Sequence, residues 1–235
     1  MRIVTWNCNM AFHRKLPALM ELKPDIAIVP ECAAPEILNV KSPLAATISK
    51  VWLTHKKHKG LAVFSFGEYS IKRHEPFLED IHCMLPIEVT GPMQFHILAV
   101  WDFWYSMSGE GPLLQALNRY RKFLTSVPAL VVGDFNNHSV WDNPGKINNH
   151  ANSVKALSEL GLVSAYHSFN NIDGGKEAEP TLYWRDRTKD GLTYHVDYCF
   201  IPNSWTKRLT RVTVGSFDSW IKFSDHMPLI VDIES

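Results

Sequence analysis

Short apolar segments, rich in β-branched and aromatic side chains, recur from one end of the chain to the other. Segments of this kind predict strands. Several are apolar at consecutive positions instead of alternating, which indicates strands that are covered on both faces. We expect strands at residues 2–6, 26–30, 61–66, 82–89, 95–100, 129–132, 194–201, 212–217 and 227–233.

Three other segments carry apolar residues at helical spacing. Residues 13–22 place Leu16 and Leu19 on one face, and residues 112–126 begin with Pro112, which suits the first turn of a helix. Residues 149–160 form the third predicted helix, with Gly161 as its C-terminal stop. The polar stretch 170–180 predicts a loop. With no repeat and no linker, the pattern predicts a single α/β domain over residues 1–235, with more strand than helix.

The composition supplies enough apolar material for a large core. Of 235 residues, 46% are hydrophobic, which excludes disordered and collagen-like chains. Lysine plus arginine and aspartate plus glutamate number 24 each, so the formal net charge is zero. This balance argues against a strongly basic nucleic-acid-binding surface, but a local basic rim would suffice for a nucleic-acid partner.

Cysteine usage and the first residues bear on the cellular compartment. The four cysteines are far apart and form no C-x-x-C pair, which argues against a disulfide framework or a zinc ribbon. Reduced thiols are typical of a cytoplasmic protein. The chain opens on a predicted strand rather than a signal peptide, and no apolar run approaches the ~18 residues of a membrane span. We therefore expect a cytoplasmic protein with no membrane insertion.

Polar side chains suited to metal-assisted chemistry stand at the ends of predicted strands. They are Asn7, Glu31, Asp134, Asn136, Asp225 and His226. In α/β folds such strand ends gather at one edge of a sheet, where sites form. Several carboxylates at one edge repel each other unless a cation joins them, and hard oxygen ligands suit Mg²⁺ or Mn²⁺.

Asp197 differs because it lies inside the predicted strand 194–201. A carboxylate in a buried strand is costly unless it is paired, and His226 is the natural partner. A carboxylate on one ring nitrogen fixes the tautomer and raises the basicity of the imidazole. The other nitrogen is then available to donate to a phosphate oxygen.

Each of these residues also has a structural interpretation. An Asn or Asp after a strand is often a turn former or a helix cap. Asp197 and His226 could equally form a buried pair with no chemical role. The convergence of several such groups favours a functional site over these alternatives.

Five segments, in this order, carry a resemblance to a known family. They are residues 5–9 (TWNCN), 24–31 (PDIAIVPE), 133–136 (GDFN), 195–198 (HVDY) and 224–228 (SDHMP). From residue 3 to residue 233 the chain resembles the endonuclease/exonuclease/phosphatase superfamily. That group includes exonuclease III-like apurinic endonucleases, deoxyribonuclease I-like nucleases, inositol polyphosphate phosphatases and sphingomyelinases. The resemblance implies a four-layered α/β sandwich, with two facing β-sheets flanked by helices, and divalent-metal-dependent hydrolysis of phosphate esters.

The resemblance also implies residue roles. Glu31 is similar to the main metal ligand of the family, with Asn7 beside it, and Asp225 to a carboxylate near the metal. The expected ion is Mg²⁺ or Mn²⁺. A metal of this kind offsets the negative charge that gathers on phosphorus in the transition state.

The resemblance also implies which residues are the catalytic groups. Asp134 matches the aspartate that orients or deprotonates the attacking water, and Asn136 matches the amide that steadies that water or the phosphorane. Asp197 and His226 match the pair that polarises the phosphate. The attacking water needs a base, and the developing charge needs a donor.

The sequence departs from the family pattern near residue 101. After the strand 95–100 many relatives place a Tyr or His that contacts the phosphate, whereas this chain has Trp, whose indole N–H only donates. A further departure is a His where relatives often carry Arg, two residues before Asp197. The secondary candidates for contact with the substrate are Trp101, Asp102, Tyr105, His138 and His195.

Three hypotheses of function remain open from the sequence. The first is a metal-dependent phosphodiesterase that acts on DNA as an endonuclease or exonuclease, because Asn7, Asn9 and the compact length resemble exonuclease III-type members. The second keeps the chemistry but takes a small phosphorylated molecule or a phospholipid headgroup. The third is a non-catalytic binding module on the same fold, which the intact site residues disfavour. The number of metal ions and the oligomeric state are left open.

Overall fold

The computed structural model describes residues 1–102, 109–185 and 187–234. Six strands form the first sheet, in the order β13-β14-β1-β2-β4-β3. Within it β1 and β2 run parallel, and the other neighbours run antiparallel. The strands are β1 (Arg2–Thr5), β2 (Ile26–Ala33), β3 (Ser49–Lys56), β4 (Lys59–Ser65), β13 (Leu209–Val214) and β14 (Leu229–Ile233).

The second sheet also has six strands, in the order β5-β6-β7-β8-β12-β9. Here β7 and β8 run parallel, and the other neighbours are antiparallel. The strands are β5 (Ser70–Arg73), β6 (Met84–Thr90), β7 (Phe95–Trp101), β8 (Ala129–Asp134), β9 (Leu162–Ser164) and β12 (Asp197–Pro202).

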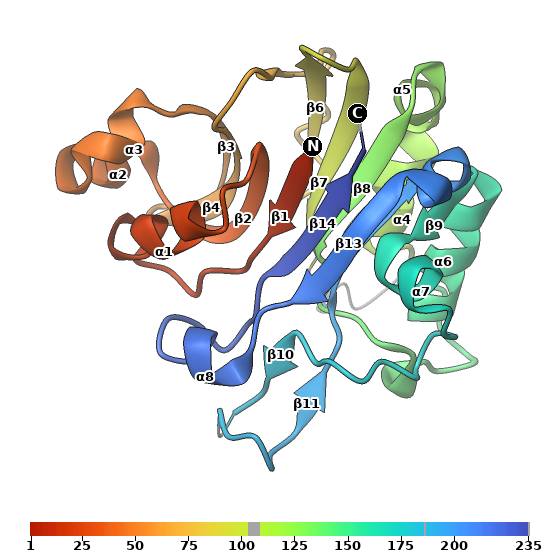
Figure 1. Cartoon of the computed structure of the whole chain (residues 1–235). Coiled ribbons are helices and arrows are strands. Elements are labelled where there is room, and N and C mark those ends of the chain that lie inside the picture. The colour runs from red at the N-terminus through yellow and green to blue at the C-terminus, as the bar shows by residue number, and fades with distance from the viewer. Residues whose placement is uncertain (103–108, 186, 235) are drawn as a thin grey trace.

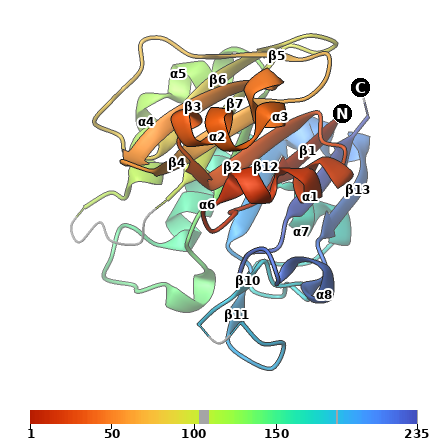
Figure 2. The same ribbon diagram turned by 90° about the vertical axis from the view of Figure 1, so that its left-hand side faces the viewer.

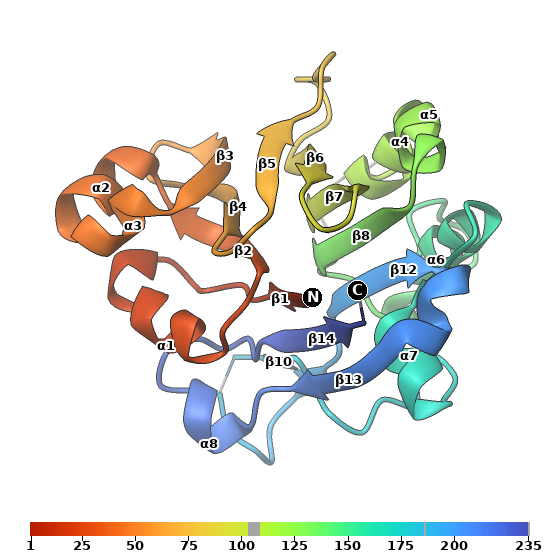
Figure 3. The ribbon, with the colours of Figure 1, turned by 45° about the horizontal axis from the view of Figure 1, so that its top comes forward.

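Helices cover the outer faces of the two sheets, as Figures 1 and 3 show. The first sheet is covered by α1 (Leu16–Glu21), α2 (Pro35–Lys41) and α3 (Pro43–Thr47). The second is covered by α4 (Pro112–Arg119), α5 (Arg121–Ser126) and α6 (His150–Glu159), while α7 (Ala165–Asn170) contacts both β12 and β13. The expected four-layered α/β sandwich is confirmed.

The apolar runs are explained by burial on both faces of each sheet. Ile3 points into the core between the sheets, and its neighbour Val4 points into the core under the helices. Ile97 and Leu98 divide in the same way in the second sheet. All four are fully buried. A strand with two apolar faces loses the alternation that marks a strand with one solvated face.

Several predicted boundaries were wrong for local reasons. The predicted helix 112–126 is two helices that meet at Tyr120, whose backbone leaves the helical region (ψ 14°) and whose hydroxyl accepts from the amide of Leu78. The predicted helix 13–22 divides into the 3-10 turn η1 (Phe12–Arg14) and α1. The predicted strand 212–217 ends at Val214, and Phe217 begins the short helix α8 (Phe217–Trp220).

The predicted strand 194–201 is also two elements. β11 (Thr193–Tyr194) pairs with β10 (Leu182–Tyr183) in a separate hairpin, and β12 begins only at Asp197. The hairpin projects from one end of the sandwich, next to α8 (Figure 2). Two further short elements are the 3-10 turns η2 (Ser139–Trp141) and η3 (Asn203–Arg208). None of the helices in the described ranges is long and apolar enough to cross a membrane.

Candidate active site

The end of β1 and the approach to β14 are held together by Ser224. Its buried hydroxyl donates to the carbonyl of Asn7 (2.7 Å) and accepts from the amide of His226 (3.0 Å). The indole of Trp6 donates to the carbonyl of His226 (2.9 Å). Two segments from opposite ends of the chain are thereby fixed in one place.

Asp134 lies at the end of β8, directly after a close contact between strands. Gly133 has a φ of +150°, and a Cβ at this position would lie 1.9 Å from the carbonyl oxygen of Val100. Only glycine tolerates both conditions. Asp134 pairs in register with Asp197 of β12 and is fully buried. The strand contact therefore sets the position of the carboxylate.

Three hydrogen bonds orient the Asp134 carboxylate. The amide of Asn7 donates to Oδ2 (2.9 Å), and the side-chain amide of Asn136 donates to the same oxygen (3.0 Å). The backbone N–H of Asn136 donates to Oδ1 (2.8 Å). Asn136 has a φ of 45°, an uncommon backbone conformation of the kind that gathers at functional sites.

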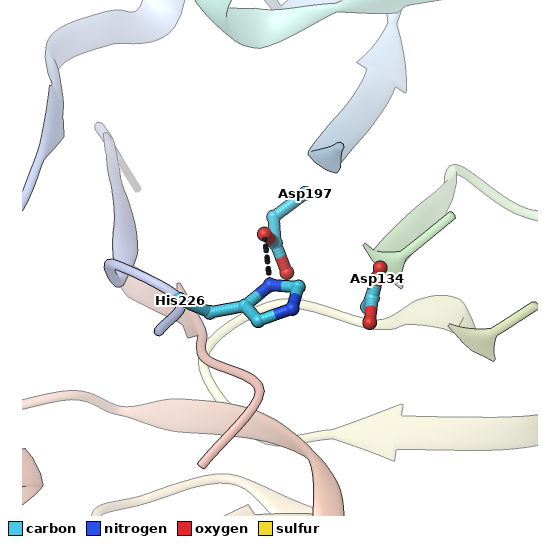
Figure 4. A group of neighbouring side chains, drawn as sticks. All are labelled: Asp134, Asp197 and His226. Carbon is cyan, nitrogen blue, oxygen red and sulfur yellow. Dashed lines mark hydrogen bonds and ion pairs between the residues drawn. The ribbon is translucent and has the colours of Figure 1, made fainter. Parts of the chain in front are cut away.

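Asp197 and His226 form a buried pair beside Asp134. Oδ2 of Asp197 lies 2.8 Å from Nδ1 of His226, and Figure 4 shows the other ring nitrogen on the side of Asp134. The hydroxyl of Thr181 accepts from the backbone N–H of Asp197 (3.0 Å). Oδ1 of Asp197 is buried without a hydrogen-bond partner among the described residues.

The three groups shift each other's protonation. Burial raises the pKa of Asp134 to about 7, with His226 opposing the rise and Asp197 adding to it. Burial disfavours the imidazolium of His226, but the carboxylates of Asp197 and Asp134 outweigh it and raise its pKa to about 10. The arrangement thus holds a buried imidazolium next to a carboxylate that titrates near neutrality. Such a pairing of one donor and one base suits acid–base chemistry at neutral pH.

Glu31 lies inside β2 rather than after the strand, where the sequence placed it. The register of β2 against β4 shifts between Val29 and Cys32, and Glu31 has a φ of 56°. A bulge of this kind re-aims a side chain. Oε2 of Glu31 lies 2.6 Å from Nζ of Lys59, and that ammonium also lies 5.3 Å from the centre of the Trp101 ring.

Asn9 connects two of the residues expected to hold a metal. Asn9 donates its side-chain amide to Oδ1 of Asp225 (3.0 Å) and its backbone N–H to Oδ1 of Asn7 (3.0 Å). Asn9 thereby holds Asp225 and Asn7 next to each other. Burial lowers the pKa of Lys15, while the charges of Asp225 and Glu31 act to raise it.

This donor set fits Mg²⁺ or Mn²⁺. The amide oxygen of Asn7 and the carboxylates of Glu31 and Asp225 are hard ligands, and each carboxylate has a second oxygen besides the one bonded to Lys59 or Asn9. Among the described residues, Asp134, Asp197 and His226 also have ligand atoms within 4.8 Å of one another. In this group Nδ1 of His226 is already engaged by Oδ2 of Asp197.

Comparison with known proteins identifies the family. The model of the endonuclease/exonuclease/phosphatase family matches residues 4–226. The chain belongs to this family. No curated protein sequence gives a match.

Solved structures of low sequence identity share the family's fold. A 3′ phosphatase from Neisseria, solved with a product DNA hairpin, is 20% identical, with a TM-score of 0.70 and full coverage of both chains. An AP endonuclease from Archaeoglobus fulgidus is 22% identical, with a TM-score of 0.66 and full coverage of both. An AP endonuclease from Leishmania major is 13% identical, with a TM-score of 0.70, over 100% of this chain and 87% of that one.

The secondary candidates for contact with the substrate differ in their burial and in their hydrogen-bond partners. Trp101 is buried in the core between the sheets, and Asp102 donates its backbone N–H to the carbonyl of Asp134 (2.9 Å). Nδ1 of His138 accepts from the amide of Val140 (3.1 Å). Nδ1 of His195 donates to the carbonyl of Glu179 (2.9 Å), and that ring is 1% exposed.

Tyr105 lies outside the described residues. Of the other secondary candidates, Trp101 pairs with Asp134 across β7 and β8, and Asp102 is hydrogen-bonded to Asp134 and Asn136. Trp101 and Asp102 are the described residues at the place where relatives carry a phosphate-contacting Tyr or His.

Three supporting residues of the candidate site had no predicted role in it from the sequence. Thr181 and Ser224 hold the backbones of Asp197 and His226, and Lys59 binds Glu31. Ser224 stands in the motif that precedes His226, so its position was a signal. Lys59 had none, because its link to Glu31 depends on the register of β2 against β4.

Proposed function

We propose that the protein is a divalent-metal-dependent phosphodiester hydrolase that acts on DNA, as an endonuclease or an exonuclease. The observation that carries the proposal is the buried Asp134 carboxylate next to the Asp197–His226 pair. A base and a donor at one point are what in-line attack of water on a phosphate requires.

Asp134 is the proposed base. Its pKa of about 7 lets it accept a proton from water at neutral pH, and the amides of Asn7 and Asn136 keep its lone pairs directed. The side-chain amide of Asn136 donates to the carbonyl of Asp102 (2.9 Å) as well as to Asp134, so its proposed role is to orient that carboxylate. The proton moves from the water to Asp134 as the new phosphorus–oxygen bond forms. The bond from phosphorus to the leaving oxygen breaks, and the leaving oxygen takes a proton from solvent water.

His226 is the proposed donor to the phosphate. Asp197 holds Nδ1, which leaves Nε2–H to donate to a non-bridging oxygen whose charge grows during the attack. Asp197 contributes by fixing the orientation and the charge of the ring.

Asn7, Glu31 and Asp225 are the residues proposed to hold the metal. Bound there, Mg²⁺ or Mn²⁺ would offset charge on the phosphate and on the leaving oxygen. Asn9 holds one oxygen of Asp225 and so orients that ligand in advance, whereas the ammonium of Lys59 lies on one oxygen of Glu31 and competes with a metal there.

DNA is the proposed substrate class. The Neisseria structure holds a product DNA hairpin, and the proteins from Archaeoglobus fulgidus and Leishmania major are AP endonucleases. These likenesses, together with membership of the family, support a nuclease over a phosphoesterase for small molecules. The intact Asp134, Asp197 and His226 support an enzyme over a binding module.

The test is hydrolysis by the wild-type protein with Mg²⁺, Mn²⁺ or EDTA. The substrates are labelled single-stranded DNA, duplex DNA, a duplex with one abasic site, and a chromogenic phosphodiester. We expect metal-dependent cleavage of DNA that EDTA abolishes. Cleavage of the chromogenic ester alone would move the substrate class to small phosphoesters, and no hydrolysis of any substrate would contradict the proposal.

A further inference from the structure

Three aromatic side chains form a cluster at one end of the sandwich. Trp141 ends η2, Trp184 follows β10, and Tyr194 ends β11. The ring centres of Trp141 and Tyr194 are 4.4 Å apart, and Trp184 lies 5.9 Å from Tyr194 and 6.4 Å from Trp141. We refer to Trp141, Trp184 and Tyr194 as the aromatic platform.

The aromatic platform is built from segments that also hold catalytic residues. η2 begins three residues after Asn136, and β11 ends three residues before Asp197. β10 connects the platform to His226, because Leu182 forms a β-bridge with His226. Side chains alternate along a strand, so Trp184 continues the face that Leu182 presents, about 7 Å further on.

His138 holds the turn η2, which ends at Trp141 of the aromatic platform. Nδ1 of His138 caps η2 by accepting from Val140, and its Nε2 lies 3.5 Å from Oε2 of Glu177. The same carboxylate binds Nε2 of His167 (2.8 Å) and accepts from the backbone of Gly175 (2.9 Å). A side chain held in this way loses little freedom when a ligand binds.

The outer part of the platform faces solvent. Trp184 is 39% exposed, whereas its neighbour Tyr183 is buried against Phe217. The guanidinium of Arg185 lies 4.4 Å from the centre of the Trp184 ring. Core packing therefore explains Tyr183 but not Trp184. A partly exposed indole with an arginine over its ring supplies an aromatic surface for a base and a cation for a phosphate.

We propose that the aromatic platform stacks an unpaired nucleobase next to the cleaved phosphate, with Arg185 facing the phosphate backbone. This inference rests on the proposed nuclease function and narrows its substrate. A base inside a duplex already stacks on its neighbours and cannot stack on Trp184 without leaving the helix. The preferred substrate is therefore DNA with a single-stranded or unpaired nucleotide at the scissile bond.

The first experiment measures binding in EDTA, so that it does not depend on hydrolysis. A single-stranded oligonucleotide carries a fluorescent adenine analogue, whose emission falls when it stacks on an indole. The proteins are wild type, Trp184→Ala, Trp184→Phe and Phe169→Ala. Phe169 is 42% exposed on α7 and is the matched control for the loss of an exposed aromatic ring.

We expect the wild type to quench the analogue and Trp184→Ala to bind about ten-fold or more weakly, because stacking on an aromatic side chain has this magnitude per base. Trp184→Phe should recover most of the affinity, and Phe169→Ala should match the wild type. Equal binding by Trp184→Ala and wild type would overturn the inference. Tighter wild-type binding to a blunt duplex than to the single strand would overturn it as well.

The two proposals fail in different ways. If wild type hydrolyses no phosphodiester but the aromatic platform still stacks the analogue, the nuclease function is wrong and the binding surface stands. If wild type cleaves DNA and the binding of Trp184→Ala is unchanged, the nuclease function stands and the platform inference is wrong.

Discussion

Nδ1 of His226 lies 2.8 Å from Oδ2 of Asp197, inside the protein and between two strands that belong to different sheets. β12 carries Asp197, and the segment that leads into β14 carries His226. The pair therefore exists only when both sheets are packed face to face. The chemistry of the imidazole therefore depends on the packing of the two sheets against each other.

Asp197→Asn tests the pair. The raised pKa of His226, about 10, keeps Nε2–H in place through neutral pH, and that proton is lost only as the pH rises toward 10. Without the Asp197 charge the pKa of the imidazole falls, so we expect the alkaline limb of the kcat–pH profile to move to lower pH. The rate should also fall by about 10–100-fold, as for other groups that orient a catalytic imidazole.

The matched control for this variant is Asp232→Asn. Asp232 is also a carboxylate paired with a cation, Arg2, but it lies at the opposite end of β1 from Asn7. Its pH profile should match that of the wild type. An Asp197→Asn profile that also matches would assign the pair a structural role only.

Gly133→Ala tests how Asp134 is positioned. The new methyl group would lie 1.9 Å from the carbonyl oxygen of Val100, so β7 and β8 would have to separate. We expect a loss of at least about 3 kcal/mol in the free energy of unfolding, measured with urea. Gly161→Ala is the control, because Gly161 also has a positive φ (75°) but meets no atom within 4 Å. It should cost only about 1 kcal/mol.

The sequence predicted the sheets and the order of the site residues well. Strands with both faces apolar marked the two sheets. The resemblance grouped Asn136 with Asp134 and Asp197 with His226, and each of these pairs is in contact. The site assignments themselves stay predictions until they are tested. The single-domain assignment over residues 1–235 likewise stays a prediction.

What the sequence did not predict depends on tertiary contacts. β3, β5, β9 and β10 are short or carry polar residues and lack a clear apolar run. Glu31 was expected after its strand, but a bulge keeps it inside β2. Lys59 binds Glu31 through the register of two antiparallel strands, which no local pattern encodes.

Lys59→Met tests whether this ammonium competes with the metal at Glu31. The 2.6 Å contact places a positive charge on one oxygen of a proposed ligand. Its removal takes away repulsion between two cations, so we expect Mn²⁺ to bind up to about five-fold more tightly in titration calorimetry, the scale of a partly exposed ion pair. Lys56→Met, on the same hairpin but exposed, should not change the affinity. Weaker Mn²⁺ binding by Lys59→Met would instead mean that Lys59 orients Glu31.

Two buried histidines predict loss of stability in acid. Burial lowers the pKa of His150 and of His195 to about 4, whereas the unfolded chain has its imidazole pKa near 6.5. Between these pH values the unfolded state binds more protons. The stability is therefore complete above pH 6.5 and falls as the pH drops toward 4.

The size of this effect is about 2 kcal/mol per histidine at pH 5, measured as the difference in free energy of unfolding from pH 7.5. His150→Gln should reduce the pH dependence by about that amount, because the titrating group is gone. His58→Gln is the control, since His58 is exposed. An unchanged pH dependence in His150→Gln would contradict the assignment of acid sensitivity to that residue.

The most direct test of the central claim is hydrolysis of DNA by Asp134→Asn compared with wild type, at saturating Mg²⁺ and with DNA binding measured in parallel. The substitution keeps the shape of the side chain but removes the base. We expect DNA binding to be retained and kcat to fall by about 10²–10⁴-fold. Wild-type kcat in Asp134→Asn would show that Asp134 is not the base.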